Sequence, residues 1–213
     1  MTQAVDNDRE LADRYRRLDA FLAKLRADIY PEPPSSVHTN LSQHMFGRVM
    51  AAYPELAGGK VLDVGCGQGV ALELFRDAGM EAVGVTLGED AAVCRSKGLN
   101  VVEQDFAFLD FPDEGFDLVW CRHAIEHSVF PFFTLSELHR VLKPGGVLYL
   151  EVPAPDTACN HQRNPNHYSV FGKSAWLQLI GRLGFADIKA LDLSFQVHAG
   201  PDTYWAFLQH KPA

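Results

Sequence analysis

One segment limits the possible folds of this chain more than any other: an apolar run that leads directly into a glycine-rich turn. The run is VLDV at residues 61–64, and the turn is GCGQG at residues 65–69. The residues that follow are typical of a helix. The segment therefore predicts a buried strand, a tight turn and a helix, and a ligand can approach the backbone of such a turn closely beside the helix N-terminus.

Short apolar runs alternate with helical segments from Lys60 onward. The runs are KVLDV, EAVGVT, NVVEQ, FDLVWC and VLYLEV, and this alternation is typical of a parallel sheet with helices on both faces. Two last runs, DIKALDLSF and TYWAFLQH, are separated by a short segment that contains AGPD and no helix, which predicts an antiparallel hairpin. We expect an α/β fold: a doubly wound, mostly parallel seven-stranded sheet with a C-terminal antiparallel hairpin, preceded by N-terminal helices.

The first 57 residues have a different pattern. Six apolar residues recur at steps of three and four and predict an amphipathic helix over residues 8–30: Leu11, Tyr15, Leu18, Leu22, Leu25 and Ile29. A second helix is expected from Ser36 to Tyr53. We expect residues 1–57 to form an N-terminal helical cap and residues 58–213 to form the main domain.

Charge and composition argue against several classes of partner. The chain has 19 Lys and Arg residues against 27 Asp and Glu residues, a formal charge of -8, which disfavours binding to nucleic acid or to an anionic membrane surface. The four cysteines form no CxxC pair, no apolar stretch reaches the length of a membrane span, and the first residues lack the apolar core of a secretory signal. We expect a cytoplasmic protein with reduced thiols. The sequence does not indicate its oligomeric state.

The spacing of the glycines distinguishes between two classes of cofactor. A dinucleotide fingerprint reads GxGxxG, but Val70 stands in the place of the third glycine. Asp63, two residues before the first glycine, would repel a pyrophosphate and would attract the ammonium or hydroxyl groups of a nucleoside that carries an amino acid. A nicotinamide-dependent oxidoreductase on a similar fold is therefore the disfavoured alternative.

Together with three further motifs, VLDVGCGQG resembles the class I (Rossmann-like, seven-stranded) S-adenosylmethionine-dependent methyltransferases over residues 55–210. The further motifs are Asp105-Phe106, FPDEGFDLVWCRHAIEH and LHRVLKPGGVLYLEVP. The resemblance implies transfer of a methyl group from S-adenosyl-L-methionine to a small or medium-sized acceptor, with S-adenosyl-L-homocysteine as the product.

The resemblance also implies which residues bind the cofactor, at the carboxyl ends of adjacent parallel strands. They are Asp63, Gly65, Cys66, Gly67 and Gly69 for the methionine end, Asp105 and the backbone N–H of Phe106 for the adenine, and Cys121, Arg122 and His123, largely through backbone atoms, for the floor of the methionine site.

The ribose contact departs from the family pattern. Thr86 ends the second strand and Leu87 follows it, at the place where the family usually has Asp or Glu to accept from both ribose hydroxyls; the resemblance implies that both residues bind the cofactor. A threonine hydroxyl lacks the paired oxygens of a carboxylate. The ribose partner is therefore open, with Glu89 or Asp90 as alternatives.

Two histidines are candidate catalytic bases. His127 follows the fourth strand, and His167 lies in the connection after the fifth strand, where the family usually docks the acceptor. Imidazole titrates near neutral pH, so O-methylation is favoured over N-methylation; the alternative role for each histidine is packing or capping. Residues 153–172 are polar and suit a hydroxylated small molecule, such as a sugar or a natural-product intermediate. A non-catalytic S-adenosylmethionine-binding protein is the alternative that the sequence leaves open.

The segment HAIEH at residues 123–127 raises the question of a metal. It is similar to the metal-binding ExxEH of small-RNA 2′-O-methyltransferases and quinone-precursor O-methyltransferases, with His123 in place of the first Glu. Glu126 and His127 would then be ligands, with His161 or His167 as a fourth. The alternative is a helix-start pair that satisfies local backbone groups. We assign no metal from the sequence.

Overall fold

The computed structural model of the chain describes residues 2–26, 31 and 33–213. The chain divides into two compact units, Met1–Tyr30 and Pro31–Ala213. The first unit holds α1 (Thr2–Arg26), which begins earlier than expected, and Ile29, expected on its apolar face, lies outside the described residues. The division into a cap of residues 1–57 and a main domain of residues 58–213 stays a prediction.

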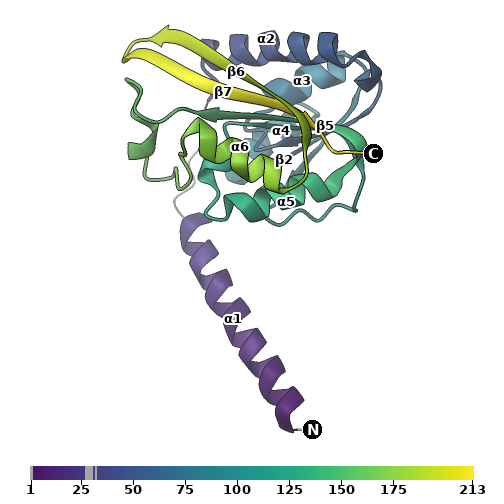
Figure 1. Cartoon of the computed structure of the whole chain (residues 1–213), viewed down its shortest axis with the longest axis vertical. Coiled ribbons are helices and arrows are strands. Elements are labelled where there is room, and N and C mark those ends of the chain that lie inside the picture. The colour runs from purple at the N-terminus through teal and green to yellow at the C-terminus, as the bar shows by residue number, and fades with distance from the viewer. Residues whose placement is uncertain (1, 27–30, 32) are drawn as a thin grey trace. The chain divides into compact units, whose positions relative to one another are not determined.

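Seven strands of the second unit form one sheet in the order β3-β2-β1-β4-β5-β7-β6, and Figure 1 shows the paired strands β6 and β7 side by side. The pairs among β1 to β5 are parallel, and β7 is antiparallel to both β5 and β6. This confirms the predicted fold class and the C-terminal hairpin. The strands are β1 (Lys60–Val64), β2 (Glu81–Thr86), β3 (Val101–Glu103), β4 (Phe116–Arg122), β5 (Leu142–Pro153), β6 (Ala186–Val197) and β7 (Gly200–His210).

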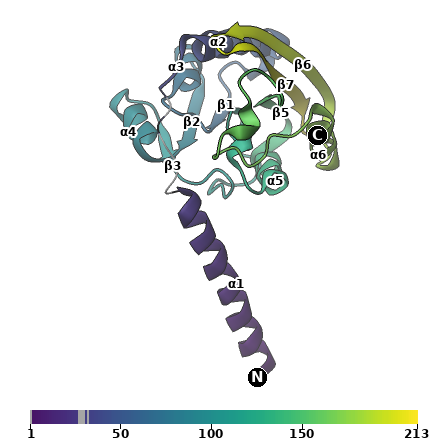
Figure 2. The same cartoon turned by 90° about the vertical axis from the view of Figure 1, so that its left-hand side faces the viewer.

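Helices cover both faces of the sheet, as Figure 2 shows. α2 and α3 contribute to the hydrophobic cluster on one face, and α5 and α6 contribute to the cluster on the other. None of the described helices is both long enough and apolar enough to span a lipid bilayer. The helices of this unit are α2 (Ser36–Ala52), α3 (Val70–Asp77), α4 (Gly88–Ser96), α5 (Pro131–Val141) and α6 (Lys173–Arg182), with short 3-10 helices η1 (Pro54–Leu56), η2 (Ile125–His127) and η3 (His161–Arg163).

The two helical layers explain why the central strands read as uninterrupted apolar runs. Successive side chains of a strand point to opposite faces. In β1, Val61 joins the cluster of α2 and α3, whereas Leu62 joins the cluster of α5 and α6, and both are fully buried. In β6, at the edge of the sheet, exposed and partly buried residues largely alternate. Only strands with both faces covered therefore need the continuous apolar pattern.

The glycine-rich turn after β1 is held between β2 and the segment that follows β4. The backbone N–H groups of Gly65 and Cys66 donate to the Val85 carbonyl oxygen at 2.9 and 3.0 Å. Gly65 has a φ of +70°, and a Cβ at this position would lie 2.3 Å from the Cβ of Ala124. The turn therefore requires glycine at position 65 for both its backbone conformation and its close packing.

We expect Gly84→Ala to lower the free energy of unfolding by about 1–3 kcal/mol, the usual cost of overpacking. A methyl group at Gly84 in β2 would lie 2.6 Å from Cys66 Sγ and from Leu72 Cδ1, directly beneath the turn. Urea denaturation of the purified variant measures the change.

Gly47→Ala is the matched control, because Gly47 is exposed within α2 and a Cβ there would meet nothing within 4 Å. We expect this variant to gain about 0.5–1 kcal/mol, since alanine loses less conformational entropy in a helix than glycine does. Equal stability of the two variants would contradict the tight packing under the turn.

Candidate active site

The predicted site residues gather where β1, β2 and β4 end. β1 lies between β2 and β4 in the sheet. After β1 the chain adds β2 and β3 on one side of β1, and it then crosses to the other side of β1 to form β4. Open α/β sheets bind ligands at such a reversal of strand order, outside the carboxyl ends of the strands. β7 also starts at this edge, because it is antiparallel to β5 and pairs Tyr204 with Pro153.

Asp63 is a buried carboxylate with an unsatisfied oxygen. Its exposed fraction is 3%, and its Oδ2 has no hydrogen-bond partner among the described residues. Burial raises the pKa of Asp63 to about 8, Cys94 adds to this effect, and nearby Arg122 opposes it. A buried oxygen without a partner is costly, so this carboxylate is suited to bind a cationic or hydrogen-bond-donating ligand group.

The turn beside Asp63 leaves room for such a ligand. Gly67 has a φ of +50°, and a Cβ there would meet nothing within 4 Å. Gly69 is the N-cap of α3 with a φ of 86°, and no described side chain caps this helix end. Backbone donors and open space therefore lie beside the orphaned carboxylate, which fits a ligand with an amino-acid end.

Polar groups also lie where β2 ends. Thr86 is 9% exposed, and Leu87 is the N-cap of α4. Asp90, in the first turn of α4, accepts a hydrogen bond from Gln68 Nε2 at 3.1 Å, so its carboxylate lies against the glycine-rich turn. Of Glu89 and Asp90, which the sequence offered as partners that assist Thr86, Asp90 is the one that contacts the turn through Gln68.

Asp105 and Phe106 follow β3. One carboxylate oxygen of Asp105 accepts from the Ala107 backbone N–H at 2.9 Å, which shapes the turn after the strand. Phe106 is partly buried and packs against the cluster under α5 and α6. Both residues are thus held at the same edge of the sheet as the glycine-rich turn.

The side chains after β4 form a buried ionic network that sequence reasoning did not foresee. Arg122 Nε lies 2.8 Å from Glu151 Oε1, and His123 Nε2 lies 3.0 Å from the same oxygen. The other ring nitrogen of His123 lies 3.3 Å from Glu126 Oε1. Glu151 and Glu126 are 0% and 1% exposed. His123, with a φ of 49°, therefore bridges two buried carboxylates.

The pKa values of this network follow from its pairing. Burial alone would raise the pKa of both Glu151 and Glu126. At Glu151 the charges of Arg122 and His123 outweigh this effect, and at Glu126 the contact with His123 does. The pKa of each carboxyl is therefore lowered. Burial opposes a charge on His123, yet its two carboxylate partners raise its pKa. The network therefore favours two carboxylates with an imidazolium between them.

His127 and His167 meet although they are far apart in the sequence. Their rings contact edge to face with centroids 4.6 Å apart. His127 Nδ1 lies 3.0 Å from the Asn166 carbonyl oxygen. Because a carbonyl only accepts, Nδ1 carries the proton, and the neutral ring keeps a lone pair on Nε2.

The connection after β5 brings His167 to this place. The Ser169 backbone N–H donates to the Glu126 carbonyl oxygen at 2.9 Å, and Ser169 Oγ donates to the Ser128 carbonyl oxygen at 2.6 Å. Burial lowers the pKa of His167, so its ring is neutral near neutral pH. The structure thus unites the two predicted histidines beside Glu126.

Three further side chains, those of His38, Glu151 and Tyr204, belong to this part of the structure. His38 of α2 stacks on His123 with centroids 5.4 Å apart, and its Nε2 lies 3.1 Å from the Tyr204 hydroxyl. Tyr204 contacts the His123 ring at 4.0 Å between centroids. Glu151 had a sequence signal, a carboxylate inside the apolar run VLYLEV. Tyr204 had none, because its strand meets α2 and the segment after β4 only in the folded chain.

The candidate metal ligands considered from the sequence do not all lie together in the structure. Glu126, His127 and His167 have donor atoms within 4.8 Å of one another. His123 instead pairs with the two carboxylates, and His161 pairs with Asp202.

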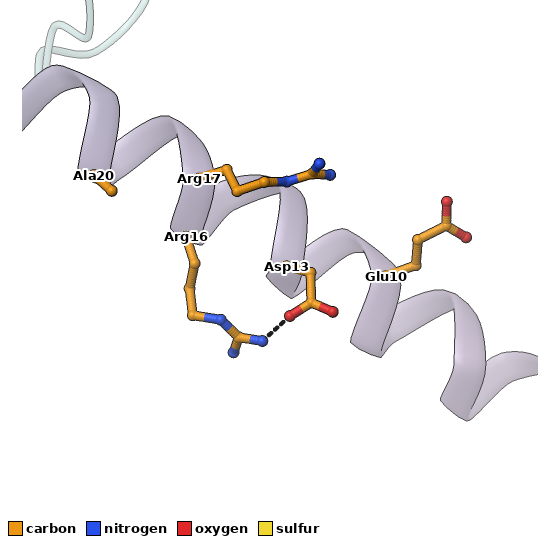
Figure 3. Close-up of a pocket in the computed structure, with 5 residues that line it drawn as sticks. All are labelled: Glu10, Asp13, Arg16, Arg17 and Ala20. Atoms are coloured by element: carbon orange, nitrogen blue, oxygen red, sulfur yellow. Dashed lines mark hydrogen bonds and ion pairs between the residues drawn. The ribbon is translucent and has the colours of Figure 1, made fainter.

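A depression on α1 does not form a comparable site. Figure 3 shows its five lining residues, and all belong to this single helix. Asp13 and Arg16 form an ion pair within the helix. No buried or convergent polar groups are present among these side chains.

Three comparisons identify proteins that share this architecture. Residues 62–150 match the methyltransferase domain family. The chain is 36% identical over 106 residues to a ubiquinone biosynthesis O-methyltransferase of Methylococcus capsulatus, covering 46% of this chain and 45% of that enzyme. The chain spans about half the length of the curated relatives it matches.

Solved structures extend the likeness over most of the chain. A SAM-dependent methyltransferase from Archaeoglobus fulgidus is 25% identical with a TM-score of 0.67, over 80% of this chain and 94% of that one. An N-methyltransferase of Haemonchus contortus, solved with phosphomonomethylethanolamine and S-adenosylhomocysteine, shares the fold at 17% identity and a TM-score of 0.70, over 80% of this chain and 53% of that one. The chain therefore matches a methyltransferase domain over residues 62–150 and shares its fold with S-adenosylmethionine-dependent methyltransferases.

Proposed function

We propose that this protein transfers a methyl group from S-adenosylmethionine to a hydroxyl oxygen of a small acceptor. The observation that carries the proposal is the unsatisfied Asp63 carboxylate beside the open glycine-rich turn. A cofactor that ends in an amino acid supplies an ammonium group, which Asp63 needs to become ionised in its buried position. The name of the curated relatives, O-methyltransferase, supports oxygen as the acceptor atom.

Each strand end would bind a different part of the cofactor. Asp63 binds the ammonium group, and the backbone from Gly65 to Gly69 surrounds the methionine end. Thr86 and Asp90 share the ribose, since Asp90 already lies against the turn through Gln68. Asp105 and the Phe106 backbone N–H bind the adenine. When bound, the cofactor supplies a sulfonium methyl group that is already activated for transfer.

His127 and His167 are placed to act on the acceptor. The Nε2 lone pair of His127 can take the proton from an acceptor hydroxyl, while the Asn166 carbonyl holds the ring in the required tautomer. Methyl transfer depends mainly on an in-line approach in a site with little water. The two histidines and the connection after β5 would orient the acceptor for this approach.

The acceptor surface favours a hydroxylated small molecule. The connection of residues 153–172 is polar and presents histidine and asparagine side chains, and the hydroxyl of Tyr204 and the ring of His38 lie beside it. These groups exchange hydrogen bonds with hydroxyls more readily than they pack against a lipid chain. A sugar or a natural-product intermediate in the cytoplasm would suit this surface.

We expect Asp63→Asn to raise the dissociation constant for S-adenosylhomocysteine by about tenfold to a hundredfold, the usual value of a charged hydrogen bond. Isothermal titration calorimetry measures it, with NADH as the comparison ligand. Asp117→Asn is the matched control, because Asp117 lies at the start of β4, where it bonds Lys143 and the Lys60 backbone N–H. Unchanged affinity in the Asp63 variant would contradict the assignment.

Cofactor affinity should depend on pH through Asp63. In the free protein Asp63 is protonated below its pKa of about 8, and only the carboxylate pairs with an ammonium group. Affinity for S-adenosylhomocysteine should therefore rise as pH increases from 6 to 8, by about tenfold per pH unit at most, and then level off. The dependence should flatten in Asp63→Asn; an unchanged slope in that variant would assign the titration to another group.

We expect His127→Ala to lower kcat by about a hundredfold or more, the usual contribution of a general base, and His167→Ala to lower it as well. Binding of S-adenosylhomocysteine should stay within about twofold of the unchanged protein. The measurement is the release of S-adenosylhomocysteine with a panel of sugars, phenols and other hydroxylated acceptors.

His44→Ala, which removes an exposed histidine of α2, is the control for this series. Full turnover in both His127→Ala and His167→Ala would show that neither imidazole is the base. Tight binding of S-adenosylhomocysteine by the unchanged protein, with no turnover on any acceptor, would favour the non-catalytic binding protein instead.

A further inference from the structure

Three side chains with different donor atoms, none of them assigned to the cofactor, converge beside the C-terminal hairpin. Cys159 lies just before η3, His161 is the first residue of η3, and Asp202 lies in β7. Their sulfur, nitrogen and oxygen atoms all lie within 4.8 Å of one another. His161 Nε2 is 3.1 and 3.0 Å from the two carboxylate oxygens of Asp202.

The backbone holds these three residues together. The Ala154 backbone N–H donates to the Thr203 carbonyl oxygen at 2.9 Å, and the Ala158 backbone N–H donates to the Pro201 carbonyl oxygen at 3.1 Å. Asp202 is 2% exposed, and its Oδ1 accepts from the Thr203 backbone N–H at 2.9 Å. The donor atoms are therefore positioned before any ligand binds, which reduces the entropy lost on binding.

The arrangement does not fit a nucleophilic cysteine. In such a site the imidazole accepts the thiol proton and a carboxylate orients the opposite ring nitrogen. Here His161 Nε2 faces Asp202, and the Cys159 thiol also faces Asp202. Both groups converge on one carboxylate, as the ligands of a shared cation do.

We propose that Cys159, His161 and Asp202 bind a zinc ion. Cysteine sulfur, histidine nitrogen and a carboxylate oxygen are all common zinc ligands, whereas calcium and magnesium prefer oxygen alone. The Asp202 carboxylate and a Cys159 thiolate would balance the charge of the dication. Three protein ligands leave a fourth tetrahedral position for water or for a polar ligand.

This zinc site is separate from the group of Glu126, His127 and His167. The His161 and His167 rings are stacked with centroids 6.1 Å apart, and the His161 ring is 5.8 Å from that of Tyr204. A zinc ion held by Cys159, His161 and Asp202 would fasten the connection after β5 to the start of β7. It would thereby stabilise the segment that carries His167 without taking a ligand from the two candidate bases.

Cobalt(II) titration of the full, metal-stripped chain tests the proposal directly. Cobalt replaces zinc in tetrahedral sites and gives a sulfur-to-cobalt charge-transfer band only when a thiolate is a ligand. We expect this band to appear at one equivalent of cobalt and to disappear when zinc displaces it. Absence of the band, or of any stoichiometric binding at micromolar protein, would overturn the proposal.

Variants assign the ligands. Cys159→Ser should abolish the charge-transfer band, and Asp202→Asn should raise the zinc dissociation constant at least about tenfold, since even residues that only support a metal ligand contribute that much. Asp156→Asn, an exposed carboxylate of the same connection, and His127→Ala should change neither measurement.

Other results would contradict the assignment whatever the variants' stability. A band that persists in Cys159→Ser would place the metal on another thiol. Metal binding that is lost in His127→Ala but kept in Cys159→Ser would place it with Glu126 and His167. The charge-transfer band of the unchanged protein tests thiolate ligation without any variant. If Asp202→Asn folds poorly, His161→Gln takes its place in the measurement of the zinc dissociation constant.

Discussion

The hydrogen bonds from the Gly65 and Cys66 backbone N–H groups to the Val85 carbonyl oxygen hold the glycine-rich turn against β2, and the rest of the site depends on them. They fix the end of β1, so that Asp63 lies buried under the turn with an oxygen that no described group satisfies. They also bring Ala124 against Gly65, which places the residues after β4 beside the same turn. A change in this attachment would displace the cofactor residues of two strands together.

The charges at this edge of the sheet divide into an ion-paired group and a carboxylate without an ion-pair partner. Glu151 and Glu126 are buried, but Arg122 and His123 lie within ion-pair distance and hold both carboxylates ionised. Breaking such a buried pair by removing one partner is costly, so this network is suited to keep the strand ends rigid. Asp63, by contrast, has a pKa raised to about 8 by burial. A cationic ligand beside it would lower this pKa and so favour the ionised carboxylate.

The fold was largely predictable, because it depends on local patterns. Apolar runs between helical segments predicted the parallel strands, and two extended runs with a short turn segment between them predicted the hairpin; the sheet order and the β6–β7 pairing confirm both. The place of the cofactor residues was also predictable, since a strand that ends in a glycine-rich turn has one geometry that suits a ligand. Their individual roles stay predictions.

The sequence by itself determined the fold class, the methyltransferase motifs and the position of Asp63 beside the turn, because each of these is a short-range pattern of burial and backbone conformation. Only the tertiary structure decided which distant side chains meet: His127 with His167, His123 with Glu151, and His161 with Asp202 and Cys159. These contacts depend on the path of the connection after β5 and on the antiparallel return of β7. The connection leaves no local periodicity in the chain, since irregular backbone is positioned by individual hydrogen bonds and not by a repeating pattern, and the hairpin pattern does not say that β7 pairs with β5.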